Sequence, residues 1–163
     1  MKTTLKYVQL YLRLSLGIGF LSAVADRLGW FGPVGHFNVD WGNWDNFVTY
    51  TRVLMPFMSR SGANVMAILA TLAELLFGIQ FLIGYKTRLA AVGSFLLTLV
   101  FALAMATFMG IKAPFNYSVF TDSAASLLLA TVTTYRWSVD NYLEQKNKEF
   151  NRTLKLKMYE NKI

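Results

Sequence analysis

Four charged side chains interrupt the apolar segments of this sequence, namely Arg13, Asp26, Glu74 and Asp122. A charge at bilayer depth is costly, so such a residue usually faces a protein interior, an opposite charge or a cavity. Glu74 lies near the middle of the apolar run ATLAELLFGIQFLIG, residues 70–84. A carboxylate there can complete a structural ion pair, or it can relay protons to a bound molecule such as a quinone.

Arg13 is the predicted partner of Glu74. It lies roughly six to eight residues, or about 10 Å, from one end of its apolar segment, and Glu74 lies only a few ångströms deeper from the same side. The arginine side chain is long enough to cover that difference. We therefore expect an Arg13–Glu74 ion pair that joins the first two apolar helices, and loss of one partner should destabilise the protein more than loss of both.

Small residues near these charges predict either a tight helix contact or a space for a ligand. In the first apolar segment, Ser15, Gly19 and Ala23 recur at every fourth position, as in closely packed membrane helices. A broad face of the second segment is shared by Ala67, Ala70, Thr71, Glu74 and Gly78. The sequence leaves both explanations open.

A second polar group is predicted at the opposite end of the first segment. Asp26 and Arg27 close this segment, while Asp122 lies about one or two turns into the last one. Further candidates at the same level are Asn116, Tyr117 and Ser118 and, from a loop, Trp30 and His36. We expect a pocket that opens outward, although helix capping and interfacial solvation can explain each residue separately.

Four apolar segments must position these side chains. Hydrophobic residues make up 55% of the 163 residues, and the mean hydropathy of +0.38 is high for a soluble domain. Segments of roughly 20 apolar residues match a hydrocarbon layer of about 30 Å. We predict an all-α polytopic membrane protein, a bundle of four transmembrane helices within residues 1–136, with spans at about 7–28, 63–83, 87–108 and 117–135.

Short links fix how these spans follow one another. The link GYKTR makes the second and third spans an antiparallel hairpin, with Gly84 suited to end one helix and Thr87 to cap the next. Pro114 ends any continuation of the third span.

The longest loop, residues 29–62, and the tail, residues 137–163, are expected to add surface helices. The aromatic residues Trp30, Trp41 and Trp44 are typical of a loop helix that lies at headgroup depth, and a lid over a binding site is the alternative. The tail predicts a basic amphipathic helix that either rests on anionic lipid or docks onto a protein partner. Its apolar stripe is formed by Val139, Leu143, Phe150, Leu154 and Met158.

The distribution of lysine and arginine predicts the orientation. One side of the bundle carries the termini and the link at residues 84–88, with Lys2, Lys6, Lys86, Arg88, Arg136, Lys146, Lys148, Arg152, Lys155, Lys157 and Lys162. The other side carries only Arg27, Arg52, Arg60 and Lys112. By the positive-inside rule, both termini are expected in the cytoplasm. The same placement of the +7 net charge favours anionic lipid over nucleic acid as its partner.

Composition also excludes several kinds of chemistry. The chain has no cysteine and one histidine, His36, so one copy cannot form a thiolate metal site, an iron–sulfur cluster or a bis-histidine haem. No metal site is predicted. Lys2, Lys6 and the AVA at residues 23–25 imitate a cleavable signal peptide. Because Arg13 interrupts the apolar core, we expect this segment to be retained.

Three stretches resemble the DoxX family of small bacterial four-helix membrane proteins: LRLSLGIGFL, AELLFGIQFLIGYKTRLAAVGS and GIKAPFNYSVFTDSAASLLLA. The resemblance covers roughly residues 10–130. It implies a bundle in the bacterial inner membrane with cytoplasmic termini, and it places Arg13 and Glu74 at the family's charged pair. The family name comes from a subunit of a thiosulfate:quinone oxidoreductase. This chain departs from the family in its lack of cysteine and its long basic tail.

Three functions remain open. The first is an accessory subunit of a quinone-linked redox system, more an oxidoreductase-associated subunit than a stand-alone enzyme, with a quinone or lipid bound non-covalently between helices near Glu74. The second is a scaffold that binds another protein, or a second copy, through its helices or tail. The third is a small-molecule carrier, which is disfavoured because no inverted repeat is evident.

Overall fold

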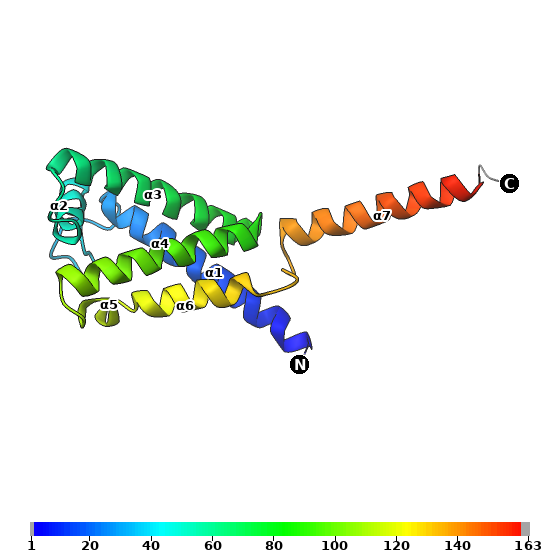
Figure 1. Ribbon diagram of the computed structural model, residues 1–163, viewed down its shortest axis with the longest axis horizontal. Helices are drawn as coiled ribbons and strands as arrows, with labels where there is room; N and C mark the ends of the chain where they lie inside the picture. The colour runs from blue at the N-terminus through cyan, green and yellow to red at the C-terminus, as the bar shows by residue number, and fades with distance from the viewer. Residues whose placement is uncertain (1, 161–163) are drawn as a thin grey trace.

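In the computed structural model, which describes residues 2–160, the chain forms seven helices and no β-strand within that range (Figure 1). Their bounds are α1 (Lys2–Arg27), α2 (Trp44–Leu54), α3 (Arg60–Ile83), α4 (Thr87–Phe108), α5 (Ala113–Asn116), α6 (Val119–Ala130) and α7 (Val139–Glu160).

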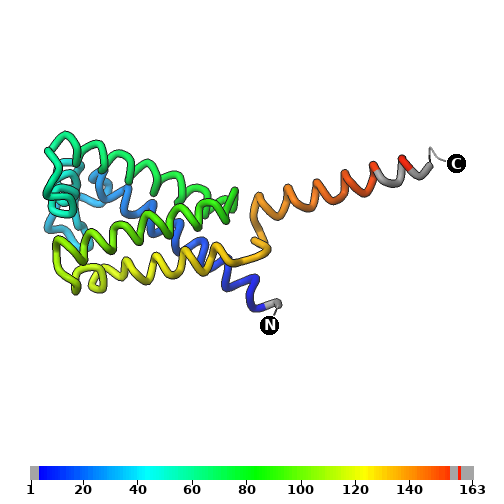
Figure 2. The backbone as a smooth tube through the Cα atoms, in the orientation of Figure 1, coloured from blue at the N-terminus to red at the C-terminus, as the bar shows by residue number. Residues whose placement is uncertain are grey.

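Four of these helices, α1, α3, α4 and α6, form a bundle. Helix α3 packs between α1 and α4, and α6 packs along α4. Figure 2 shows that α1 begins, and α7 departs, at one end of the bundle, which we call the termini end. The short helices α2 and α5 lie at the opposite end, which we call the loop end.

Three helices are long and apolar enough to cross a membrane: α1 from Thr4 onward, α3 and α4. The prediction of a helical membrane protein is therefore confirmed. The predicted fourth span at 117–135 is wrong as one continuous helix, because α6 has 12 residues and rises only about 18 Å. Helix α6 stops before Val132 and Thr133, β-branched residues that lose side-chain freedom in a helix.

Two glycines bring α1 and α3 together. A Cβ at Gly17 would lie 3.1 Å from the carbonyl oxygen of Gly78, and a Cβ at Gly78 would lie 3.2 Å from that of Gly17. A Cβ at Gly19, in contrast, would meet no atom within 4 Å. Residues two positions apart lie on nearly opposite sides of a helix. The ridge of Ser15, Gly19 and Ala23 is therefore not the contact with α3.

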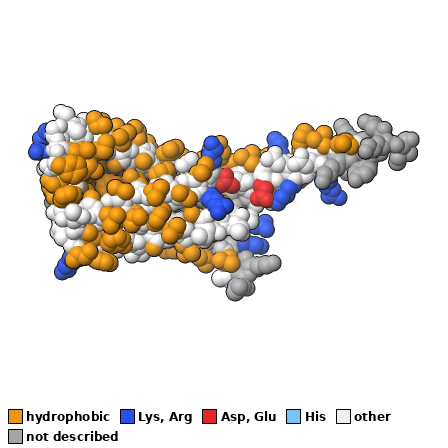
Figure 3. Space-filling view, in the orientation of Figure 1, with side chains coloured by type: hydrophobic (Ala, Val, Ile, Leu, Met, Phe, Trp, Pro, Cys, Tyr) orange, Lys and Arg blue, Asp and Glu red, His pale blue; other side chains and the backbone are white. Residues whose placement is uncertain are grey.

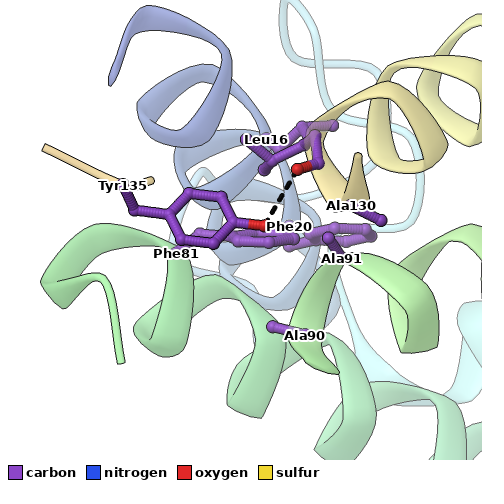
Figure 4. Close-up of a cluster of buried hydrophobic side chains, with 8 residues drawn as sticks. Leu16, Phe20, Phe81, Ala90, Ala91, Ala130 and Tyr135 are labelled. Carbon is purple, nitrogen blue, oxygen red and sulfur yellow. Dashed lines mark hydrogen bonds between the residues drawn. The ribbon is translucent and has the colours of Figure 1, made fainter. Parts of the chain in front are cut away.

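A hydrophobic cluster joins the four helices of the bundle toward the termini end (Figure 4). Its buried members are Leu16, Phe20, Phe81, Ala90, Ala91, Leu129, Ala130 and Tyr135. The hydroxyl of Tyr135 donates a hydrogen bond of 3.0 Å to the carbonyl oxygen of Leu129. This bond ties the segment after α6 back to the helix, and the cluster brings α6 into contact with α1.

The link between α3 and α4 is closed by the tail. Gly84 ends α3 in the left-handed conformation (φ 69°), as the sequence predicts. Thr87 does not cap α4, which begins after Lys86 without a side-chain cap of its own. Instead, the carboxylate of Asp140 accepts hydrogen bonds of 2.8 Å from the backbone N–H groups of Lys86 and Thr87. The first turn of α7 is thus fixed to the start of α4.

The predicted loop and tail helices are both present. Helix α2 begins where Oδ1 of Asn43 accepts a hydrogen bond from the N–H of Asn46, and its buried face packs on α3. Helix α7 leaves the termini end and extends away from the bundle (Figure 1), with Leu143 and Phe150 exposed. Figure 3 shows apolar side chains over the bundle, between charged side chains at its two ends.

Candidate functional site

Glu74 pairs with Arg27, and the predicted pair with Arg13 is wrong. Nη1 of Arg27 lies 2.6 Å from Oε2 of Glu74, and Nη2 donates a hydrogen bond of 3.1 Å to Oε1. Nη1 also donates to the hydroxyl of Thr71 at 3.1 Å. The side chains of Arg27 and Glu74 are only 4% and 7% exposed. The pair is therefore a buried link between α1 and α3.

The direction of helical side chains explains which arginine reaches Glu74. Side chains lean toward the N-terminus of their own helix, and α1 and α3 are antiparallel. Arg27, at the loop end of α1, therefore leans into the bundle, while Glu74 leans toward the loop end to meet it. Arg13 leans away toward the termini end, where its guanidinium lies beside Gly84.

Arg13 has a structural position at the termini end. It is 1% exposed, and its Nη2 donates a hydrogen bond of 2.8 Å to the carbonyl oxygen of Trp137. Nearby, the side-chain amide of Gln9 donates to the carbonyl oxygen of Arg136 at 3.2 Å. Arg13 therefore holds the connection between α6 and α7, some distance from Glu74.

Asp26 positions the loop that follows α1. Its carboxylate is buried and accepts hydrogen bonds of 3.0, 3.1 and 3.0 Å from the backbone N–H groups of Asp40, Trp41 and Gly42. The guanidinium carbon of Arg27 in turn lies 5.0 Å from the ring centre of Trp41 and 3.8 Å from that of Phe47. The loop and α2 thus cover Arg27 with aromatic rings, which attract a cation.

A cavity of about 720 Å³ lies beside this ion pair. Its walls come from α1, α2, α4 and α6, with Glu74 contributed by α3. Most of its lining is apolar, and the polar side chains among the lining residues include Arg27, Asp40, Tyr50, Glu74, Tyr117 and Asp122. The small residues Ser15, Gly19 and Ala23 line it as well, so this ridge borders a space and does not form a tight contact.

The structure brings together part of the predicted outward pocket. Of its predicted members, Arg27, Tyr117 and Asp122 line the cavity, whereas Asp26, Asn116 and Ser118 do not. Trp30 is 76% exposed, and His36 is also exposed. The indole N–H of Trp44 donates to Asn64 at 2.9 Å, so this ring supports α2 against α3.

Sequence reasoning missed Tyr50 and Phe47, which enter the cavity wall from α2. Burial, together with the nearby Tyr117 and Asp40, raises the pKa of Tyr50 to about 12, although Arg27 acts in the opposite direction. Tyr50 therefore stays protonated at neutral pH and can donate a hydrogen bond. The available signal was the spacing of Phe47, Tyr50 and Thr51 on one face of a short helix. Within residues 2–160, no group of three His, Asp or Glu side chains could hold a metal ion.

Comparison with known proteins identifies the family. The model of the family described as TQO small subunit DoxD matches residues 50–163. The match includes α3, α4, α6 and α7, with Glu74, and leaves α1 with Arg27 outside it. No curated protein and no solved structure is significantly similar to the chain. Because the family match covers well over half of the chain, this protein belongs to the DoxD family of DoxX-like proteins.

Proposed function

We propose that this protein is an accessory membrane subunit of a redox system and that its cavity binds the headgroup of a quinone. The family description as a TQO small subunit supports the redox role, and three membrane-length helices support the location. The excess of lysine and arginine at the termini end supports a cytoplasmic position for that end in a bacterial inner membrane. In this proposal α6, together with α5, provides the fourth crossing.

The observation that carries the proposal is the buried Arg27–Glu74 pair on the wall of an apolar cavity. Small-molecule sites usually occupy about 300–1,000 Å³ and combine apolar walls with a few placed polar groups. The cavity of about 720 Å³ falls within this range. A quinone headgroup is a flat ring with two carbonyl oxygens, so aromatic walls and hydrogen-bond donors fit it.

Each polar residue of the cavity has a role in this proposal. Nε of Arg27 has no hydrogen-bond acceptor within residues 2–160, and the Tyr50 hydroxyl is protonated, so both can donate to carbonyl oxygens. The ring of Trp41 can stack on the bound ring. A quinone takes up two electrons and two protons on reduction. Glu74 and Asp122 are the carboxylates that can hold such protons at the cavity wall.

The electrons are assigned to a partner subunit, because a chain with no cysteine and one histidine offers few ligands for an electron-carrying centre of its own. Binding and chemistry are thereby divided between two proteins. The present chain would hold the quinone, exclude water from it and deliver protons to it.

Quinone titration of the purified protein in lipid nanodiscs tests the proposal. A short-chain quinone should quench tryptophan fluorescence because Trp41 lies in the cavity wall. We expect Tyr50→Phe to weaken binding about tenfold, the value of one well-placed hydrogen bond of about 1.4 kcal/mol. Tyr142→Phe is the matched control, since Tyr142 is exposed on α7. Equal affinity in wild type and Tyr50→Phe, or no saturable binding, would contradict the proposal.

Assembly with a protein partner is a second candidate function. Helix α7 extends from the bundle with Leu143, Phe150 and Met158 exposed along it. A membrane subunit that docks through this stripe should lose its partner in Phe150→Glu while the bundle stays folded. Retention of all co-purifying proteins by this variant would argue against docking through α7. Truncation is a poorer test because Asp140 caps α4.

A further inference from the structure

Helices α1 and α6 both line the cavity. The two helices meet toward the termini end, where Leu16 belongs to the same cluster as Leu129 and Ala130. Elsewhere α1 packs mainly along α3, and α6 mainly along α4. Figure 1 shows α1 running obliquely across the bundle. Nearer the loop end, residues of both helices line the cavity, with Gly19 and Ala23 on α1 and Asp122 and Ala125 on α6.

Some residues on these two helices line the cavity and are also exposed. They are Ser15 and Gly19 on α1 and Asp122 on α6. Ser15 and Gly19 lie well inside the part of α1 that is long and apolar enough to span a membrane. The opening at these residues therefore faces the bilayer.

Polarity changes along the cavity. Its polar groups Arg27, Glu74 and Tyr50 gather near the loop end, whereas Leu12 and Leu16 line it toward the termini end. The rise along α1 between Leu12 and Arg27 is about 22 Å. A space with one polar end and a long apolar part matches a molecule with a small polar head and a long apolar chain.

We propose that the space edged by Ser15, Gly19 and Asp122 is a lateral opening through which a membrane-dissolved, long-chain quinone reaches the cavity, and along which its chain remains. This inference rests on the proposed function, because it uses the same headgroup site. At that site Nε of Arg27 is buried without a hydrogen-bond partner within residues 2–160, while Oε2 of Glu74 is held in the ion pair with Arg27. Gly19 keeps the opening free because it has no side chain.

Cysteine labelling tests the opening directly, since the chain contains no cysteine. Ser15→Cys places a thiol of nearly the same size on the edge. Ile18→Cys is the matched control, because Ile18 is 61% exposed on α1 and does not line the cavity. Both variants are labelled in lipid vesicles with a lipid-soluble maleimide. Each labelling reaction is run without quinone, with a long-chain quinone, and with a short-chain quinone that has the same headgroup.

The expected result is that the long-chain quinone slows labelling of Ser15→Cys about tenfold and leaves Ile18→Cys within about twofold, while the short-chain quinone affects neither. If both quinones raise the thermal stability of the wild type but neither slows labelling, the opening is overturned and the proposed function stands. If neither quinone binds, both are overturned. Resistance of Ser15→Cys to labelling without quinone, with cross-linking to a second copy, would identify the space as a subunit interface and also overturn the opening.

A second variant measures the effect on binding. Gly19→Leu should fill the opening without a backbone clash, because a Cβ there meets no atom within 4 Å. We expect it to weaken long-chain quinone binding about tenfold and to leave short-chain binding within about twofold. Ile18→Phe, which adds bulk on the exposed face, should change neither. Unchanged long-chain binding in a folded Gly19→Leu protein would contradict the inference.

Discussion

Arg27 and Glu74 are 47 positions apart in the sequence, and Nη1 of Arg27 lies 2.6 Å from Oε2 of Glu74. The contact joins the last residue of α1 to the middle of α3 and forms part of the cavity wall. Both groups are almost fully buried, so each depends on the other for compensation of its charge.

Single substitutions of this pair should therefore be worse than the double substitution. We expect Arg27→Met or Glu74→Gln alone to lower the free energy of unfolding by about 3–5 kcal/mol, because each leaves the partner's buried charge without an opposite charge. The combined variant should recover much of that loss. Thermal unfolding in detergent, followed by circular dichroism, measures the three variants against wild type.

The control for this cycle is Arg13→Met combined with Glu74→Gln. Arg13 contacts Trp137 and not Glu74, so these two effects should add within about 0.5 kcal/mol. Additive losses for Arg27→Met and Glu74→Gln, or coupling between Arg13 and Glu74, would contradict the observed pairing.

Sequence patterns were sufficient to predict the apolar helices but not the pairing of their charges. Composition and segment length indicated α1, α3 and α4, and Gly84 marked the end of α3. Equal depth suggested Arg13 as the partner of Glu74. That estimate neglected the first residues of α1, which begins at Lys2, and the lean of side chains toward each helix N-terminus. Register between two helices depends on their packed surfaces, which one sequence does not specify.

The contact between Gly17 and Gly78 makes a second prediction. Gly78→Ala should destabilise the bundle by about 1–3 kcal/mol, the usual cost of overpacking, since its Cβ would lie 2.8 Å from Cγ of Leu21 and 3.2 Å from the carbonyl oxygen of Gly17. Gly19→Ala should be neutral or stabilising by up to about 1 kcal/mol, through helix propensity. Thermal unfolding compares Gly78→Ala with Gly19→Ala. Equal effects on stability would contradict the placement of Gly78, and not Gly19, in the contact between α1 and α3.

The cap that the tail supplies to α4 makes a third prediction. Asp140→Ala removes the acceptor for the N–H groups of Lys86 and Thr87, and loss of a helix cap usually costs about 0.5–2 kcal/mol. We expect faster amide hydrogen exchange at the first turn of α4. Glu149→Ala, at an exposed carboxylate of α7, is the control. Unchanged exchange in Asp140→Ala would mean that water replaces the carboxylate without cost.

This cap is also a contact, at the termini end of the bundle, that the sequence alone could not predict. Thr87 precedes an apolar run and resembles a cap, but Lys86 enters the helix with φ 48°. The carboxylate that binds the free N–H groups comes from a residue 53 positions later. Local preference could predict that α4 needs an acceptor. It could not predict that α7 would deliver one, because that depends on how Arg13 and Tyr135 hold the chain between α6 and α7.

The high pKa of Tyr50, about 12, makes a pH-dependent prediction. An unfolded tyrosine ionises near pH 10, so between about pH 10 and 12 the unfolded state loses this proton while the folded state keeps it. The contribution of Tyr50 to stability is therefore complete below pH 10 and falls as the pH rises toward 12. In Tyr50→Phe, the free energy of unfolding should therefore fall less steeply with pH in this range.

A titration of phenolate absorbance in the folded protein checks the same assignment. Its most alkaline component should be lost in Tyr50→Phe and kept in Tyr142→Phe, because Tyr142 is exposed. If Tyr50→Phe leaves both curves unchanged, Tyr50 is not buried in the cavity wall as a neutral donor, and the proposed hydrogen bond to a quinone would lose its support.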